Sequence, residues 1–231
     1  MRNQPWPRRL QPLSLLTIAG LALLSQAPLA PRLAHADEEG MEATYREHIT
    51  RCQKGGDRQA VVACEKALQL RPDDFMTWTN LGVRLGNLGD YEAALEAHNR
   101  ALRLRPTYSL ALVNRCADQV ALNRWVEAIS SCEQALEGDG RWGQLGPAIA
   151  WYNLALAQQG LERYDRSRQS LNRALELDGS LAAAWNRLGY AWERLGNPEE
   201  AVQAYRQALE LAPSRSEYRE NLNRAQGRLR F

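Results

Sequence analysis

The sequence predicts an all-α solenoid built from helical hairpins, and three observations support this prediction. One pattern of small and apolar residues recurs along most of the chain, and its copies begin at Met41, Phe75, Ser109, Ala148 and Ala182. Successive copies begin 34 residues apart, except that the third and fourth begin 39 apart, and such a period is typical of stacked helix pairs. Apolar residues within a copy recur at three- to four-residue spacing, as on one side of a helix. Turn signals such as Gly89-Asp90 and Asn197-Pro198 separate the two helices of a copy.

The chain opens with a segment, residues 1–36, that has the three parts of a secretory signal. Basic residues come first, an apolar run over residues 13–24 follows, and Ala34-His35-Ala36 ends the segment. The apolar run is shorter than the roughly 20 residues that a membrane-spanning helix needs. We therefore expect cleavage after Ala36 and export to a periplasm, a thylakoid lumen or the cell exterior. The alternative is an uncleaved segment that tethers the protein to a membrane.

The best preserved copies place the same residue types at the same positions. One copy has Trp78, Leu81, Gly82, Ala94, Ala101 and Pro106, and the other has Trp185, Leu188, Gly189, Ala201, Ala208 and Pro213. These residues and their spacing resemble the tetratricopeptide repeat (TPR) family. The resemblance implies a TPR-type α-solenoid, a right-handed superhelix of about five hairpins over residues 37–215, with a capping helix over residues 216–231. The hairpins are expected at residues 41–74, 75–108, 109–147, 148–181 and 182–215.

A glycine-rich stretch, residues 138–147, separates the third and fourth copies. Its four glycines exclude the interior of a helix, so we expect a loop that carries the five-residue insertion and interrupts the regular superhelix. Arg141 and Trp142 are candidate anchors for a partner at the edge of this loop. The alternative is that Trp142 folds back and fills the gap between the two copies.

The four cysteines are expected to form two disulfides, because oxidation is the default state outside the cytosol. Cys116 and Cys132 fall on facing helices of the third copy, and Cys52 and Cys64 fall on facing helices of the first. We expect pairing within each copy, and the alternative is buried free thiols. The sequence has no CxxC and no paired histidines, so we expect no metal site.

The surface that lines the inner side of the superhelix is the expected binding site. The TPR resemblance implies that the second, fifth, ninth and twelfth residues of each copy face this groove. The candidates are Met76, Thr79, Val83, Leu110, Val113, Val120, Ile149, Tyr152, Leu156, Asn186 and Tyr190. This lining is apolar and lacks the Lys and Asn of the TPR domains that clamp carboxylates, so it favours an extended peptide or an amphipathic helix. The alternative is that the groove closes on the final helix.

A further candidate, Arg187, replaces the asparagine that the second, third and fourth copies carry at the same position, as Asn80, Asn114 and Asn153. The resemblance implies asparagine at this position, and asparagine can hydrogen-bond the backbone of a ligand. The fork of donors on Arg187 suits a carboxylate instead.

Several function classes are disfavoured. The net charge is +2, but residues 1–36 hold four arginines and no acid, which leaves 25 basic and 27 acidic residues in the remainder. This remainder lacks the basic excess of a nucleic-acid-binding protein. The sequence contains no nucleophile elbow, phosphate-binding loop or HExxH motif, so we expect no enzymatic activity and no cofactor. The recurring tryptophans Trp78, Trp151 and Trp185 are interpreted as core residues.

The sequence therefore predicts an exported scaffold whose groove binds a segment of a partner protein. The resemblance implies a role such as the assembly of a membrane or envelope complex. Two alternatives stay open: a structural solenoid that self-associates into homo-oligomers, and a carrier of a small apolar ligand.

Overall fold

The computed structural model describes the backbone of residues 29–229 and the side chains from residue 38 onward. The chain divides into two units, residues 1–39 and residues 40–231. The basic and apolar parts of the predicted signal lie outside the described residues. Residues 34–36, where we expect cleavage, belong to the first helix. All that follows concerns the second unit.

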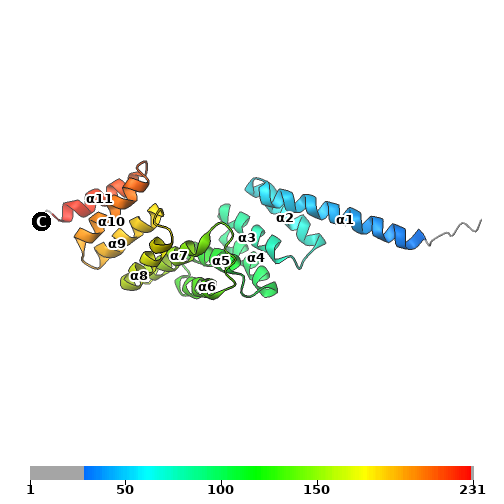
Figure 1. Cartoon of the computed structure of the whole chain (residues 1–231), viewed down its shortest axis with the longest axis horizontal. Coiled ribbons are helices and arrows are strands. Elements are labelled where there is room, and N and C mark those ends of the chain that lie inside the picture. Colours follow the sequence, from blue (N-terminus) through cyan, green and yellow to red (C-terminus); the bar gives the residue numbers. More distant parts are fainter. Residues whose placement is uncertain (1–28, 230–231) are drawn as a thin grey trace, which may run out of the picture. The chain divides into compact units, whose positions relative to one another are not determined.

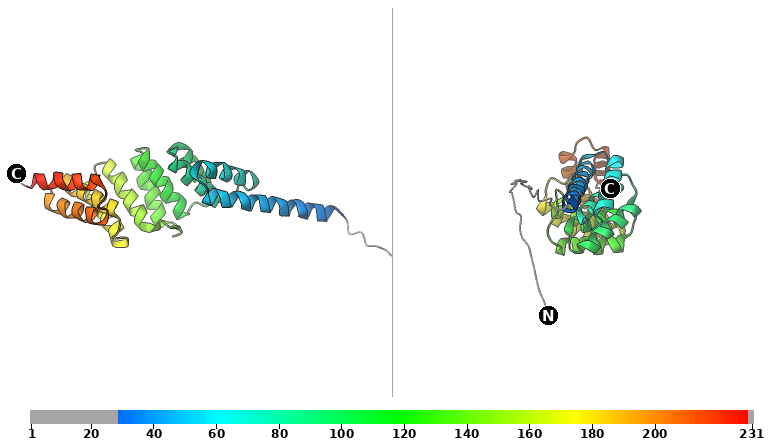
Figure 2. Two further views of the ribbon diagram at one scale, coloured as in Figure 1. Left: turned by 90° about the horizontal axis from the view of Figure 1, so that it is seen from above. Right: turned by 90° about the vertical axis from the view of Figure 1, so that its right-hand side faces the viewer.

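Every regular element between residues 29 and 229 is an α-helix. The helices are α1 (Leu29–Lys54), α2 (Asp57–Leu70), α3 (Phe75–Asn87), α4 (Tyr91–Leu104), α5 (Ser109–Ala121), α6 (Trp125–Glu137), α7 (Gly146–Gly160), α8 (Tyr164–Leu177), α9 (Ala182–Arg194), α10 (Pro198–Leu211) and α11 (Ser216–Arg228). From α2 onward, each helix packs against the next one along the chain, so successive hairpins stack in a row (Figures 1 and 2). The predicted all-helical solenoid is therefore confirmed.

Two helix types alternate along this row. The first helices of the hairpins are α1, α3, α5, α7 and α9, and the second helices are α2, α4, α6, α8 and α10. Helix α11 begins 34 residues after α9 and packs on α9 and α10. It thus occupies the place of a further first helix.

In units two to five, the turn between the two helices has a left-handed backbone at the fifteenth residue of the unit. Gly89 and Gly196 adopt it with φ of 83° and 79°, which glycine does without steric cost. Asn123 and Glu162 stand at the same position of the third and fourth units with φ of 58° and 56°. A non-glycine residue there costs roughly 1–2 kcal/mol, so the surrounding hairpin must enforce this turn.

The two helices of a hairpin meet at the eighth and twenty-fourth residues of the unit. The pairs are Gly82 with His98, Cys116 with Cys132, Ala155 with Leu171, and Gly189 with Tyr205. Every partner at position twenty-four is fully buried. A Cβ added to Gly189 would lie 2.7 Å from the Tyr205 ring, and one added to Gly82 would overlap the His98 ring. Glycine is therefore required opposite the rings of His98 and Tyr205, whereas alanine is tolerated opposite Leu171.

Both predicted disulfides are present. Cys52–Cys64 joins α1 to α2, and Cys116–Cys132 joins α5 to α6. Cys116 and Cys132 occupy positions eight and twenty-four, so the third hairpin has a covalent bond where the fifth has a glycine facing a ring. The alternative of buried free thiols is wrong for this structure.

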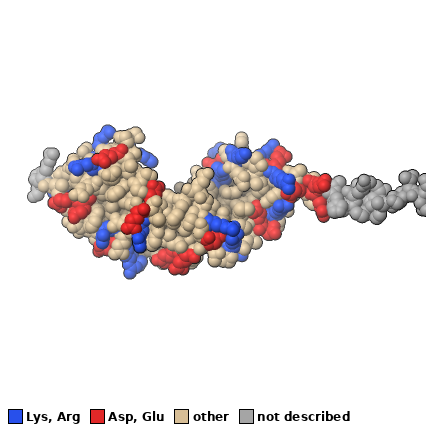
Figure 3. Space-filling view, viewed as in Figure 1, with Lys and Arg blue, Asp and Glu red and all other residues tan. Residues whose placement is uncertain are grey.

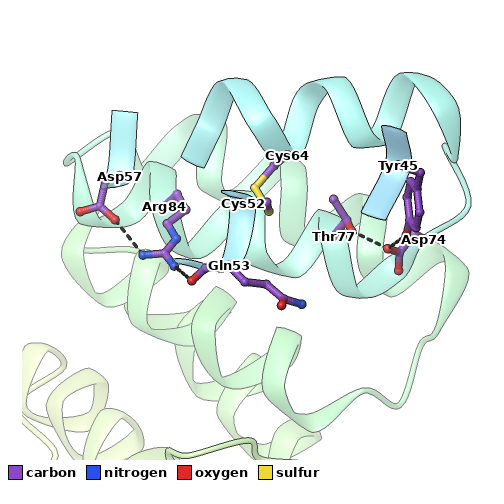
Figure 4. Close-up of a disulfide and its surroundings, with 8 residues drawn as sticks. All are labelled: Tyr45, Cys52, Gln53, Asp57, Cys64, Asp74, Thr77 and Arg84. Carbon is purple, nitrogen blue, oxygen red and sulfur yellow. Dashed lines mark hydrogen bonds and ion pairs between the residues drawn. A yellow bond between two sulfur atoms is a disulfide. The ribbon is translucent and has the colours of Figure 1, made fainter. Parts of the chain in front are cut away.

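The first disulfide lies beside polar contacts that tie the first hairpin to α3 (Figure 4). Tyr45 Oη donates to Asp74 Oδ2 at 2.5 Å. At the other end of α3, Arg84 Nη1 lies 3.1 Å from Asp57 Oδ1, and Arg84 Nη2 donates to the carbonyl oxygen of Gln53 at 2.6 Å. Hydrogen bonds from Asn87 and Arg84 lower the pKa of Asp57. Helix α3 is thereby held at both ends.

Replacing Gly189 with alanine tests the close approach of the helices. We expect Gly189→Ala to lower the free energy of unfolding by about 1–3 kcal/mol, because the new methyl group overlaps the Tyr205 ring. Urea denaturation followed by circular dichroism measures this change. The control is Gly227→Ala in α11, where the added Cβ meets no atom within 4 Å and removal of a helical glycine stabilises by up to about 1 kcal/mol. Equal changes in the free energy of unfolding for the two variants would contradict the requirement for glycine at position 189.

Candidate functional site

A pocket on the side formed by the first helices, here called the first-helix face, is the candidate site. It has a volume of about 240 Å³. Its lining residues come from the four helices α5, α6, α7 and α9: Val120, Trp125, Leu156, Gln159, Gly160, Arg187 and Tyr190. Four of these were predicted as groove residues and come from the third, fourth and fifth units: Val120, Leu156, Arg187 and Tyr190. The structure thus brings together residues that the sequence separates by up to 70 positions.

Three lining residues, Trp125, Gln159 and Gly160, were not predicted. The Trp125 indole packs directly on Gly160, where any Cβ would overlap the ring. Gln159 Nε2 donates to the carbonyl oxygen of Arg187 at 3.0 Å. Gln159 Oε1 is buried and has no hydrogen-bond donor within the described part of the chain. The pocket therefore combines an aromatic wall with an unused acceptor.

The charge at the rim of the pocket comes from Arg187, whose side chain is exposed. No carboxylate between residues 38 and 229 forms an ion pair with it. Its guanidinium lies beside Tyr152, whose pKa is raised by burial and lowered in part by Arg187. The Arg187 guanidinium therefore has no carboxylate partner among residues 38–229, although it lies within hydrogen-bonding reach of Tyr152.

An aromatic cluster supports Tyr190 from behind. The Tyr164 and Tyr190 rings meet edge to face with their centroids 6.0 Å apart. The Arg194 guanidinium lies 4.7 Å from the centroid of the Tyr164 ring, and Arg194 Nη1 donates to Tyr190 Oη at 3.2 Å. Cation–π and hydrogen-bond contacts of this kind fix the orientation of a ring. Tyr190 is thus a preorganised wall of the pocket.

Three predicted groove residues are wrong as ligand contacts because they are buried. Thr79 is 1% exposed, and its Oγ1 donates to the carbonyl oxygen of Phe75 in the same helix. Val113 is 1% exposed and belongs to the core cluster around Leu112. Asn186 is covered by α11, where Asn221 Nδ2 donates to Asn186 Oδ1 at 2.8 Å.

The final helix closes part of the first-helix face. Burial raises the pKa of Tyr152, and Tyr218 and Glu217 at the start of α11 add to this rise. Tyr152 is accordingly half-buried between α9 and α11 rather than open to a ligand. The remaining candidates lie away from the pocket: Met76 is exposed, and Val83, Leu110 and Ile149 are half-buried.

The inserted loop folds onto the start of α5. Asp139 Oδ1 accepts a hydrogen bond from the backbone N–H of Ser109, and Leu110 N donates to the carbonyl oxygen of Arg141 at 3.1 Å. Trp142 is half-buried and packs against the core cluster next to Leu110. The prediction of Trp142 as an exposed anchor is therefore corrected, whereas Arg141 is exposed.

The described residues give no sign of two other kinds of site. Between residues 38 and 229, no group of three or more His, Cys, Asp or Glu side chains is placed to hold a metal ion. None of the described helices combines the length and the apolar character needed to cross a bilayer. Basic and acidic side chains are interspersed on the face drawn in Figure 3.

Comparisons with known proteins agree with this fold. Models of the tetratricopeptide repeat match residues 63–96, 148–181 and 182–215. The chain belongs to the tetratricopeptide repeat family. It is 26% identical over 215 residues to the peroxisomal targeting signal receptor of Candida albicans, an alignment that covers 87% of this chain and 35% of the receptor. The chain therefore spans about a third of that relative.

Two solved structures share the fold of this TPR protein. PilW, a type IV pilus biogenesis factor, is 18% identical with a TM-score of 0.70, and the match covers 81% of this chain and 86% of PilW. YrrB, described as a TPR protein with an unusual peptide-binding site, is 15% identical with a TM-score of 0.64. That match covers 82% of this chain and 95% of YrrB.

Glu193 stands at a predicted groove position but is turned away from the pocket. Its side chain is 4% exposed, and its carboxylate accepts hydrogen bonds from Tyr205 at 2.6 Å, Arg224 at 3.0 Å and Arg228 at 3.2 Å. Burial opposes ionisation, but the bonds from Arg224 and Tyr205 outweigh it and lower the pKa of Glu193. Glu193 thus joins α9 to α10 and α11.

We expect Glu193→Gln to lower the free energy of unfolding by about 1–3 kcal/mol at neutral pH, because it removes charge-assisted hydrogen bonds. Because the pKa of Glu193 is lower in the folded state than in the unfolded chain, ionised Glu193 stabilises the protein at pH values above the unfolded-state pKa. This stabilisation is lost as the pH falls through the folded-state pKa of Glu193. The difference between the two proteins should therefore shrink below about pH 4, as measured by urea denaturation across pH. A difference that stays constant down to about pH 2 would contradict the ionised role of Glu193.

Proposed function

We propose that the chain is an exported, non-catalytic scaffold that binds a segment of a partner protein on its first-helix face. One observation carries the proposal: the pocket places apolar walls, an unpaired arginine and an unused acceptor side by side. Val120, Leu156 and Tyr190 suit an apolar side chain. A pocket of about 240 Å³ is smaller than the usual site for a small ligand, about 300–1,000 Å³. It is suited to one side chain of a longer segment.

The polar groups of the pocket suit a peptide rather than a wholly apolar molecule. Gln159 Oε1 can accept a backbone N–H after a small side-chain movement, and the Arg187 fork can donate to a carboxylate. A small apolar ligand would leave both groups without partners. The receptor from Candida albicans is named for a targeting signal, and YrrB is described as having a peptide-binding site; both are consistent with this function.

Export is supported by the two disulfides, since such bonds persist mainly in oxidising compartments. The predicted secretory signal at residues 1–36 supports it independently of the cysteines. In such a compartment, a scaffold of this family would help assemble a membrane or envelope complex.

Variants of the pocket test partner binding. We expect Arg187→Ala to weaken the affinity for the partner about tenfold or more, since a hydrogen bond to a charged group contributes about 1.5–3 kcal/mol. Leu156→Asp should weaken it further by placing a charge on the apolar wall. The partner is first captured in its native compartment through a photo-crosslinking residue at position 190. Its affinity for each variant is then measured by calorimetry.

The matched control is Arg206→Ala, which removes an exposed arginine from α10 on the other side of the same hairpin. This variant should bind as tightly as the unmodified chain. Unchanged affinity in both pocket variants would exclude the pocket. Sedimentation at several concentrations separates a monomer with a partner from a self-associating solenoid.

A further inference from the structure

A larger cleft lies between the second helices α6 and α8. Its volume is about 800 Å³, and its lining includes Leu136, Trp151 and Leu154 together with polar side chains from both helices. The first-helix pocket shares none of its lining residues. The cleft is thus a separate feature that the proposed groove function does not use.

The equivalent cleft one junction earlier, between α4 and α6, is much smaller. It has a volume of about 300 Å³ and is lined by residues at corresponding unit positions. Arg115 of α5 crosses that cleft: its Nε donates to Ser131 Oγ at 3.0 Å, its Nη1 to Asn99 Oδ1 at 3.3 Å and its Nη2 to Gln134 Oε1 at 3.1 Å. The seventh residue of the next unit is Leu154. A leucine cannot make this bridge, so the larger cleft stays open.

The inserted loop also changes the floor of the larger cleft. Trp78 and Trp185 donate their indole N–H to the carbonyl oxygen six residues earlier, at 2.8 Å to Pro72 and 3.0 Å to Gly179. Trp151 is the equivalent tryptophan of the fourth unit, and the insertion precedes it. No acceptor among residues 38–229 receives its N–H. Trp151 is half-buried and lines the cleft, so a ligand can use both its ring and its donor.

The two walls of the cleft carry opposite charges. Glu133 and Glu137 are exposed on α6 one helical turn apart, and neither forms an ion pair within the described part of the chain. Arg166 on α8 is likewise exposed and unpaired there, and Arg173 on α8 is paired with Glu176 at 2.7 Å. The unpaired charges are therefore negative along α6 and positive along α8.

We propose that this cleft binds an amphipathic helix of a partner protein. The apolar stripe of that helix covers Leu136, Trp151 and Leu154. Lysine or arginine residues four apart on one edge face Glu133 and Glu137, because residues at this spacing share a helix face. An acidic residue on the opposite edge faces Arg166. This arrangement matches the helix-in-groove mode of recognition, in which charged edges set the orientation of the bound helix.

The experiment is a surface-display selection against the full disulfide-bonded chain. The library consists of helices of about 18 residues, a length of roughly 27 Å, with a fixed apolar stripe and both edges randomised. We expect the selected helices to carry Lys or Arg at four-residue spacing on one edge and Asp or Glu on the other. Glu133→Lys/Glu137→Lys should weaken them at least tenfold. Glu210→Lys, at the position of Glu137 in the last unit, should leave them unchanged.

Trp151→Phe keeps the aromatic ring and removes the indole donor, so it should weaken the selected helices several-fold without loss of the fold. Circular dichroism and retention of the disulfides confirm folding of each variant. A selection that returns no helix sensitive to Glu133 and Glu137, or helices with no preference for edge charge, would overturn the proposal. Binding of a glycan from an array, lost in Trp151→Phe, would assign the cleft to carbohydrate instead.

Discussion

The structure depends on how closely the two helices of each hairpin approach one another. Positions eight and twenty-four of the unit set this distance, and the chain fills them with four different pairs in units two to five. The residue at position twenty-four is fully buried in each of these units. Because a unit of about 34 residues has no core of its own, the apolar surface of one hairpin is buried only when the neighbouring hairpin has the same shape. Both proposed binding surfaces rest on this regularity.

The sequence predicts the helices and disulfides well because these features are local or repeat with the unit. Glycines and caps mark the turns, and Cys116 and Cys132 can pair because they stand at facing positions of one hairpin. The pocket residues Val120, Leu156 and Tyr190 were predictable for the same reason. The burial of Thr79, Val113 and Asn186 was not predictable, because a repeat position defines the side of a helix but not how deeply the adjacent unit covers it. Helix α11 covers Asn186, and only the structure shows this contact.

The interruption after the third unit is where sequence reasoning is weakest. Spacing reveals an insertion, but it does not reveal that Asp139 and Arg141 bind the loop to the start of α5. Nor does spacing reveal that Trp142 joins the core. One signal of the wide cleft was present in the sequence: Arg115 and Leu154 stand at the same unit position. Whether this difference leaves an open cleft depends on the distance between α6 and α8, which the sequence does not give.

The four pairs at positions eight and twenty-four differ in the solvent conditions to which they are sensitive. The ring opposite Gly82 belongs to His98, whose Nε2 lies 3.3 Å from Asp118 Oδ2 of the next unit. Burial raises the pKa of Asp118, so acid changes the charge of that junction. The third hairpin is held by a bond that a reductant cleaves. The fourth relies on Ala155 and Leu171, which neither acid nor reductant alters. Since neighbouring units contribute separately to stability, acid and a reductant weaken different junctions of the same array.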